Sequence, residues 1–291
     1  MPTPSSLRIA LAGAGRVGTA VAVLLAEAGH EIAGVWSRSD ESARRARDLL
    51  GSDAIQPGSE IKADVLLVGA GDTAIEEVAA TFGPSLPPGC IVWHFAGSRG
   101  VAPLAAGVGR SDLYLLAGHP VQACPSVVLG IARLPGSAWG VTCSADVRAR
   151  AFSLITSSLG GVPVEVREED RPLWHAASVM TSNGIAALLG SGEALLGAIG
   201  VVDPIGVLGP LAAGTVANAV VGGGGDATLT GPIVRGETDV VAGHLAALRE
   251  VAPHLADTYE GIAWMILAAA SRARRIEEPV AAEIGAALEA R

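Results

Sequence analysis

The stretch of sequence that decides the fold is LRIALAGAGRVG, residues 7–18. A short apolar run is followed by a glycine turn, and alanine and leucine then recur at helical spacing up to Ala28. This order of strand, G-x-G-x-x-G turn and helix is typical of a dinucleotide-binding βαβ unit, whose glycines allow a tight bend and close approach of a pyrophosphate. The alternative is a glycine turn that binds nothing. We expect the turn to bind a dinucleotide through Gly13, Ala14, Gly15, Arg16, Val17 and Gly18.

The alternation of strands and helices continues as far as Arg167. Strands are predicted at 31–36, 64–69, 91–95, 113–117, 139–143 and 163–166, and helices at 40–50, 72–82 and 144–159, with a Pro-rich loop before the strand at 139–143. This pattern predicts an α/β fold with a Rossmann-type, doubly wound parallel sheet. From Glu168 onward apolar residues recur only at helical spacing. We therefore expect a nucleotide-binding domain at 1–167 and an all-helical substrate and dimerisation domain at 168–291.

The residues after the second predicted strand favour NADP over NAD. An NAD site carries an acidic residue about 20 residues after the glycine turn, where it binds the ribose. This sequence has Ser37, Arg38 and Ser39 there instead. A guanidinium beside hydroxyls suits the 2′-phosphate of NADP, because it donates two hydrogen bonds and no carboxylate repels the phosphate. The alternative is a solvated loop arginine.

Two further loops should line the nicotinamide half of the site, because ligands of open α/β sheets lie beyond the carboxyl ends of the strands. These loops follow the third and fourth predicted strands. Their candidate cofactor-binding residues are Gly69, Ala70 and Gly71 in the first loop and His94, Ala96 and Gly97 in the second. The only lysine, Lys62, precedes the third strand and is expected at the opposite edge of the sheet.

Composition limits the partners. The net charge is −9 without a basic cluster, which argues against nucleic acid, and three widely spaced cysteines suggest neither a disulfide framework nor a metal site. Mean hydropathy is +0.45, but the most apolar stretch, 197–221, contains Asp, Asn and two prolines, so no membrane span is expected. Residues 1–6 lack the basic start of a signal peptide. A cytoplasmic protein with a small-molecule substrate is expected.

Histidine is the first candidate for the proton donor that carbonyl or imine reduction needs. His119 ends a predicted strand, and His175 shares a polar helical stripe with two serines, with Asn183 on its adjoining edge. A buried polar stripe marks either a cleft or a subunit contact. Arg235 lies in a Gly-bounded loop and could bind a substrate carboxylate. His244, on the helix that follows this loop, is the second candidate for substrate binding. The alternative is a structural arginine that ties this loop to a helix end or to a neighbouring subunit.

Several segments together resemble one family. They are the glycine turn, His119-Pro120-Val121-Gln122, residues 174–183, and 231–236 together with His244-Leu245. The chain resembles Rossmann-like oxidoreductases with a C-terminal helical domain of unknown function, which are similar to pyrroline-5-carboxylate reductases and β-hydroxyacid dehydrogenases. Some relatives are an alternative type of ketopantoate reductase. The resemblance matches Asn183 to a catalytic asparagine, but Val179 stands where hydroxyacid dehydrogenases have their catalytic lysine.

These observations leave three hypotheses. The first is an NADPH-dependent reductase of a small 2-oxo acid such as ketopantoate, with His119 or His175 as proton donor, or solvent in their place. The second is an imine reductase of the pyrroline-carboxylate type. The third is a redox sensor that binds NADP without catalysis. The Ala- and Gly-rich helical domain also suggests a homodimer.

Overall fold

The computed structural model describes residues 6–290 of the chain. The expectation that no signal peptide is present depends on residues 1–6, of which 1–5 lie outside the described part. The chain divides into two compact units, 1–182 and 183–291, and each is described by itself. The boundary expected at 167/168 falls earlier in the chain than this division, because the helix that carries His175 belongs with the sheet.

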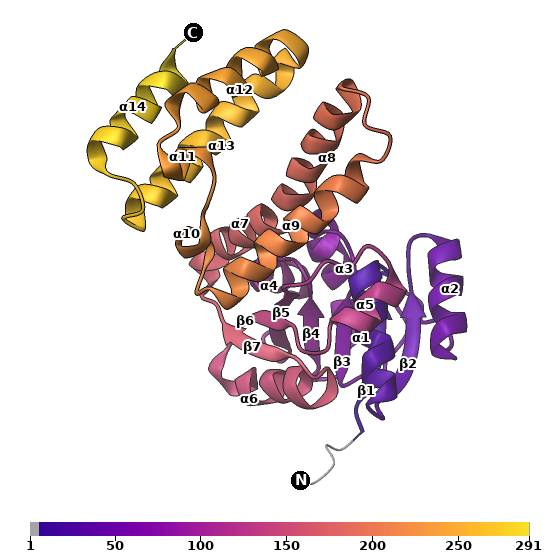
Figure 1. The fold of residues 1–291 in the computed structure, drawn as a ribbon. Helices are drawn as coiled ribbons and strands as arrows, with labels where there is room; N and C mark the ends of the chain where they lie inside the picture. Colours follow the sequence, from indigo (N-terminus) through magenta and orange to yellow (C-terminus); the bar gives the residue numbers. More distant parts are fainter. Residues whose placement is uncertain (1–5, 291) are drawn as a thin grey trace. The chain divides into compact units, whose positions relative to one another are not determined.

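The first unit is built on a seven-stranded sheet with the order β2-β1-β3-β4-β5-β6-β7 (Figure 1). The strands are β1 (Arg8–Ala12), β2 (Glu31–Trp36), β3 (Val65–Val68), β4 (Ile91–His94), β5 (Tyr114–Pro120), β6 (Ala138–Cys143) and β7 (Val162–Glu165). All neighbouring strands are parallel except β5 and β6. The predicted Rossmann-type sheet is confirmed, with one reversal in direction that the sequence pattern did not predict.

Helices cover both faces of this sheet. They are α1 (Arg16–Glu27), α2 (Asp40–Leu50), α3 (Ile75–Phe82), α4 (Ala102–Val108), α5 (Val127–Arg133), α6 (Ala145–Ser153) and α7 (Arg171–Thr181). Shorter turns are η1 (Asp72–Ala74), η2 (Gly83–Ser85), the π-helical η3 (Leu154–Ser158) and η4 (Glu168–Asp170). Helices α4 and α5 were not predicted, and α5 lies in the segment expected to be a Pro-rich loop.

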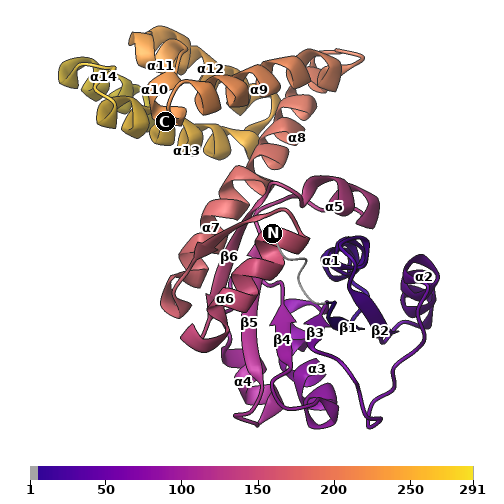
Figure 2. The same cartoon turned by 90° about the horizontal axis from the view of Figure 1, so that it is seen from below.

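The alternation of side chains along β1 shows how the two faces are filled. Ile9 and Leu11 belong to one buried cluster, which also contains residues of α1 and α6. Ala10 and Ala12 belong to a second cluster with residues of α3 and α4. Figure 2 shows the central strands between these two sets of helices. Both faces are therefore apolar, as expected for a parallel sheet with helices on either side.

The order of the strands locates the point where the chain changes direction across the sheet. Strand β1 pairs with β2 on one side and with β3 on the other. The loops after β1 and β3 therefore leave the sheet next to each other, at its carboxyl edge. This is the position at which open α/β sheets bind their ligands.

The second unit contains only helices, as predicted. They are α8 (Asn183–Ala198), α9 (Pro204–Val221), α10 (Gly225–Thr228), α11 (Pro232–Arg235), α12 (Thr238–Val251), α13 (Pro253–Arg272) and α14 (Glu278–Glu289). Helices α12, α13 and α14 pack around a buried cluster that includes Val241, Leu267 and Ile284. Helices α8 and α9 lie side by side, and neither has a buried residue.

One expectation about the second unit needs correction. Asn183 begins a new helix rather than continuing the one that carries His175, because α7 ends at Thr181. The serine, asparagine and glycine at 182–184 are weak helix formers, which explains the break. In addition, α9 is long and apolar enough to cross a membrane by length and composition, despite its internal proline. One such helix is weak evidence for a membrane span.

Candidate functional site

The glycine turn packs backbone to backbone against the loop after β3. A Cβ atom on Gly15 would lie 2.4 Å from the carbonyl oxygen of Gly69, and one on Gly18 would lie 2.8 Å from the Cα of Gly69. Gly13 has a φ of +93°, which ordinary residues rarely adopt. Gly13, Gly15 and Gly18 are therefore required where the glycine turn contacts the loop after β3, because no side chain fits between the two backbones.

The N-terminus of α1 can hold a pyrophosphate. Its N-cap residue is Gly15, which offers no side-chain cap, so the first-turn amides of α1 have no partner within the helix. The amides of Gly13 and Gly15 are already used, by the carbonyls of Trp36 at 2.7 Å and Gly69 at 3.2 Å. A bound pyrophosphate would therefore accept hydrogen bonds from the amides of 16–18.

The side chain of Arg16 points elsewhere. Its Nη1 donates to the carbonyl oxygen of Pro125 at 3.1 Å, so it ties the glycine turn to the segment before α5. Arg16 can contribute its backbone amide to a dinucleotide while its guanidinium stabilises this loop. Ala14 and Val17 are half-buried and pack against the apolar cluster beneath the turn.

The three residues after β2 differ in how free they are to bind a phosphate. Arg38 is exposed, and its side chain has no hydrogen bond or ion pair within the described residues. Ser39 is the N-cap of α2 and accepts a hydrogen bond from the amide of Ser42 at 3.3 Å. Ser37 is half-buried. Arg38 is therefore the available cation at this position, and Ser39 already has a structural role.

The loop after β4 is shaped by His94, which is fully buried. Its Nδ1 accepts a hydrogen bond from the amide of Ala96 at 3.1 Å, so Nε2 carries the proton and donates to the carbonyl of Gly100 at 2.7 Å. Burial lowers the pKa of His94 to about 4. Because both ring nitrogens are occupied, His94 holds the loop that carries Ala96 and Gly97 rather than offering a free ring nitrogen.

Gly97, His119 and His175 meet at one place in the first unit. A Cβ atom on Gly97 would lie 2.9 Å from Nε2 of His119 and 2.4 Å from Cδ2 of His175. The two imidazole rings are 5.6 Å apart between centroids and nearly perpendicular, at 88°. The two histidines predicted as proton donors therefore lie together, against the loop after β4.

The loop after β3 contributes a carboxylate near this cluster. Ser98 donates to Asp72 at 3.3 Å and so joins the loops after β3 and β4. Gly71 is the N-cap of η1, and Gly69 and Ala70 form the turn that meets the glycine loop. The three predicted residues at 69–71 thus stand at the carboxyl edge, as expected.

Two residues that sequence reasoning did not select also belong to this region. Trp174 donates from its indole nitrogen to Nδ1 of His119 at 3.2 Å. Arg171 is fully buried, donates from Nε to Thr142 at 2.7 Å, and bonds from Nη2 to the carbonyls of Ala117 and Gly140. Arg171 thereby fastens α7 to strands β5 and β6. An arginine at the start of an apolar helix was the available signal in the sequence.

The remaining predicted residues lie in the second unit. Arg235 forms a two-pronged ion pair with Glu237, with distances of 2.7 Å and 2.8 Å. His244 is exposed, and its Nδ1 is 2.7 Å from the hydroxyl of Tyr259. Asn183 is the first residue of α8. These three residues belong to the second unit, which is described by itself, so their part in a common site with the histidines stays a prediction.

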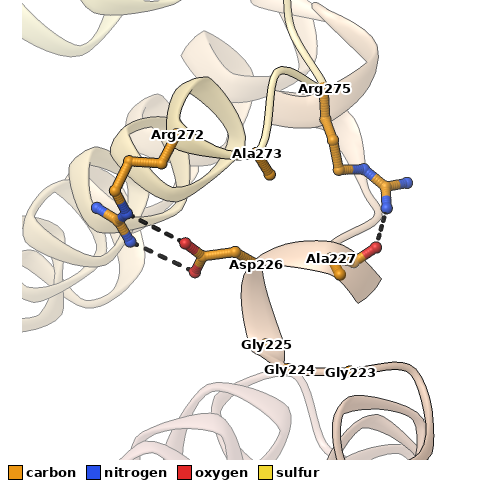
Figure 3. A pocket seen from close by; sticks show the side chains of 8 residues that line it. All are labelled: Gly223, Gly224, Gly225, Asp226, Ala227, Arg272, Ala273 and Arg275. Carbon is orange, nitrogen blue, oxygen red and sulfur yellow. Dashed lines mark hydrogen bonds and ion pairs between the residues drawn. The ribbon is translucent and has the colours of Figure 1, made fainter.

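A cavity of about 670 Å³ in the second unit is also lined by arginines, but they are already engaged (Figure 3). Arg272 donates to Asp226 at 3.1 Å and 3.3 Å, and Arg275 donates to the carbonyl of Ala227. These contacts join α10 to the end of α13 and to the residues that follow it. We assign them a structural role.

Lys62 lies just before β3, at the opposite edge of the sheet from the glycine turn. It is exposed and lines a cavity of about 670 Å³ together with Arg8 and the prolines at 84, 87 and 88. Lysine therefore takes no part in the histidine cluster. Within residues 6–290, no group of three metal-ligating side chains could hold a metal ion.

Two family models match the chain in succession. A Rossmann-like domain matches residues 3–120, and a domain of unknown function, DUF2520, matches residues 137–266. This combination confirms the resemblance expected from the sequence. The second match begins at β6, inside the first unit, and ends within α13. No curated protein matches the sequence.

Solved structures share the fold at low sequence identity. A protein from Bacteroides fragilis to which NADP oxidoreductase activity is attributed is 22% identical, with a TM-score of 0.73 over 90% of this chain and 98% of the other. A reductive aminase from Aspergillus terreus, in complex with NADPH and ethyl-5-oxohexanoate, is 17% identical, with a TM-score of 0.64 over 97% and 99% of the two chains. A pyrroline-5-carboxylate reductase from Coxiella burnetii is 17% identical, with a TM-score of 0.56 over 98% of both chains.

Proposed function

We propose that this Rossmann-like chain is an NADP-dependent oxidoreductase that reduces a small carbonyl compound bearing a carboxylate. The observation that carries the proposal is the meeting of Gly97, His119 and His175 at the carboxyl edge of a sheet whose glycine turn can hold a dinucleotide. The proposal rests also on the fold, which is shared with structures named for NADP or NADPH.

The cofactor we propose is NADPH, which would supply a hydride from its nicotinamide ring. The first-turn amides of α1 would bind its pyrophosphate, and Arg38 would bind its 2′-phosphate. The loops carrying Gly71 and Gly97 would lie beside the nicotinamide. Residues 37–39 then offer a cation for the phosphate and no carboxylate.

The chemistry of the chain's own residues would be binding and proton supply. As the hydride reaches the carbonyl carbon, negative charge develops on the oxygen, and a ring N–H of His119 would stabilise it. A proton from His175 or from solvent then completes the alcohol. Asn183 would orient the substrate, and Arg235 would exchange the carboxylate of Glu237 for that of the substrate. Exposed ion pairs contribute little to stability because water screens them, so this exchange is feasible.

A 2-oxo acid such as ketopantoate is the substrate class we favour, and a cyclic imine of the pyrroline-carboxylate type is the second. The neighbours named as a reductive aminase and a pyrroline-5-carboxylate reductase support the imine about as well as the fold supports the 2-oxo acid. Both classes carry the carboxylate that Arg235 would bind. They differ in whether hydride transfer leaves an oxygen or a nitrogen to be protonated.

The experiment is a panel of 2-oxo acids and cyclic imines, each incubated with NADPH that carries deuterium at both C4 positions, so that transfer from either face is detected. Mass spectrometry should find one deuterium in the product of one class. Binding of NADPH by calorimetry, with no deuterium transferred to any member of either class, would favour the redox sensor. Equal affinity for NADH and NADPH would contradict the choice of cofactor.

We also propose that α8 and α9 pair with those of a second copy of the chain. These two helices and their connection expose Val202 (99%), Val221 (88%), Val220 (79%), Ile199 (71%) and Leu211 (67%). Exposed apolar patches of this kind mark interaction surfaces. A membrane is the competing partner, but 18 residues span only about 27 Å, slightly less than a bilayer core.

Sedimentation equilibrium of the whole chain tests this assignment. A dimer is expected, and Leu211→Glu should convert it to a monomer. Val128→Glu is the matched control, because Val128 is equally exposed but lies on α5 of the first unit. A monomeric wild-type chain that floats with phospholipid vesicles would instead support the membrane. The cytoplasmic location stays a prediction.

A further inference from the structure

The hydrogen bond from Trp174 to His119 determines which nitrogen of the imidazole carries a proton. The indole nitrogen of tryptophan is only a donor, so Nδ1 of His119, 3.2 Å away, must accept with its lone pair. A neutral imidazole has one N–H, and here it must be at Nε2. The tautomer of His119 therefore follows from a contact between residues that are 55 positions apart in the chain.

The indole of Trp174, which donates this hydrogen bond, is held in place by two sets of contacts. The Trp174 indole lies against β6, where a Cβ atom on Gly140 would be 2.5 Å from its Cε2 and 2.6 Å from its Nε1. One turn earlier on the same helix, Arg171 bonds to the carbonyls of Ala117 and Gly140. Because both the ring and its helix are fixed to the strands, the indole N–H keeps its direction toward His119.

The other ring nitrogen of His119 faces the candidate site. The position a Cβ would take on Gly97 lies 2.9 Å from Nε2, so this nitrogen is directed at the loop after β4. No side-chain hydrogen bond of Nε2 occurs within the described residues. Since the first nitrogen is occupied by Trp174, the nitrogen that faces the loop is the one that carries the proton.

The surroundings of His119 also oppose a positive charge on it. Burial is the largest influence and disfavours the imidazolium. His175 and Arg171 on α7 and His94 on β4 act in the same direction, whereas Asp72 in η1 favours the charge, and together these effects lower the pKa of His119 to about 4. At neutral pH the ring is then an uncharged hydrogen-bond donor rather than an acid.

We propose that Trp174 is a positioning residue that fixes His119 as the neutral Nε2–H tautomer, so that this N–H is presented to the substrate atom that receives negative charge during reduction. The substrate part rests on the proposed function, whereas the tautomer does not. In this arrangement His119 keeps its proton throughout. Hydride adds to the carbonyl carbon, the electron pair of the C=O bond moves to oxygen, and the proton that completes the alcohol comes from His175 or solvent.

Nuclear magnetic resonance of the whole chain with ¹⁵N-labelled histidine tests the tautomer without any substrate. The chain has six histidines, so the His119 signals are assigned by their loss in His119→Asn. We expect a single Nε2–H pattern for His119 between about pH 5.5 and 8, in keeping with its low pKa. In Trp174→Phe a mixture of both tautomers is expected. Trp264→Phe, on α13 of the second unit, is the matched control and should leave His119 unchanged.

An Nδ1–H pattern in the wild type, an imidazolium at pH 6 to 7, or an unchanged tautomer in Trp174→Phe would each overturn the proposal. A kinetic measurement then tests the substrate part. Trp174→Phe should lower kcat by about three- to tenfold while the KM for NADPH stays within twofold. A residue with a purely structural role would instead lower the melting temperature and weaken NADPH binding together. If the tautomer is as proposed but no substrate is reduced, the proposed function fails and the tautomer assignment stands.

Discussion

Two aromatic pairs in this molecule have almost the same geometry and very different surroundings. His119 and His175 in the first unit are 5.6 Å apart at 88°, and His244 and Tyr259 in the second unit are 5.7 Å apart at 89°. His119 is held by Trp174, opposes Gly97 and lies near Arg171. His244 is exposed and its bond is to a hydroxyl. Ring geometry is therefore no guide to function here, because the two pairs differ in their burial and in their hydrogen-bond partners.

The largest effect expected from this difference is on turnover. His119→Ala should lower kcat by roughly a hundred- to ten-thousandfold, the range for loss of a positioned proton-transfer or hydrogen-bonding group. His244→Ala, the matched change in the other pair, should alter kcat by less than about threefold. Steady-state kinetics with the substrate found in the deuterium experiment measures both. Similar losses of kcat in the two variants would show that the different surroundings of the two pairs do not determine their roles in turnover.

The cofactor half of the first unit gives the next largest effect. Arg38→Ala should weaken NADPH binding about ten- to a hundredfold and leave NADH binding nearly unchanged, because one charge-assisted phosphate contact is lost. Calorimetric titration with each cofactor measures the two affinities. Arg44→Ala, on α2 a few residues later, is the control and should change neither affinity. Equal weakening for both cofactors would mean that Arg38 does not contact the 2′-phosphate.

Acid should destabilise the first unit through its buried histidines. The pKa values of His94 and His119 are lowered to about 4 from a usual 6.5, so the unfolded chain binds more protons between these values. Stability is then lost as pH falls from about 6.5 toward about 4, by up to roughly 3 kcal/mol per histidine. Melting temperatures recorded across this range should fall less steeply in His119→Asn than in the wild type.

The smallest effect concerns Arg235 in the second unit. Arg235→Lys should raise the KM for an acid substrate about three- to tenfold, because the two-pronged contact with a carboxylate is lost. Its melting temperature should stay within about 1 °C, since the exposed ion pair with Glu237 contributes little. A lowered melting temperature with an unchanged KM would make Arg235 a structural residue and separate it from the histidine cluster.

Local pattern was enough to predict most of the first unit. The glycine turn, the first four strands and the carboxyl-edge loops follow from residues that are close in sequence, because each βαβ unit fixes its own geometry. Helix α5 was missed because its seven residues are too few to show a helical period between prolines. The reversal at β6 was missed because strand direction depends on pairing partners, which composition does not reveal.

The candidate site was predictable only in part, because its geometry also depends on contacts between residues that are far apart in the chain. His119 and His175 were selected by residue type and position, but their contact depends on α7 packing against β5. The contacts that orient them join residues far apart in the chain: Trp174 to His119, and Arg171 to Ala117, 54 positions away. The sequence also could not indicate that Glu237 would pair with Arg235, since two neighbouring charges can point in any direction in a loop.

The single lysine makes this protein simple to label chemically. Lys62 is exposed at the sheet edge opposite the glycine turn, so an amine-reactive fluorophore would attach there without touching the histidines or the nucleotide loops. Any free α-amino group has a pKa about two units lower than lysine and can be blocked first at mildly acidic pH. The product would carry one dye at one known position. Fluorescence energy transfer from a bound reduced nicotinamide to that dye would then report ligand binding.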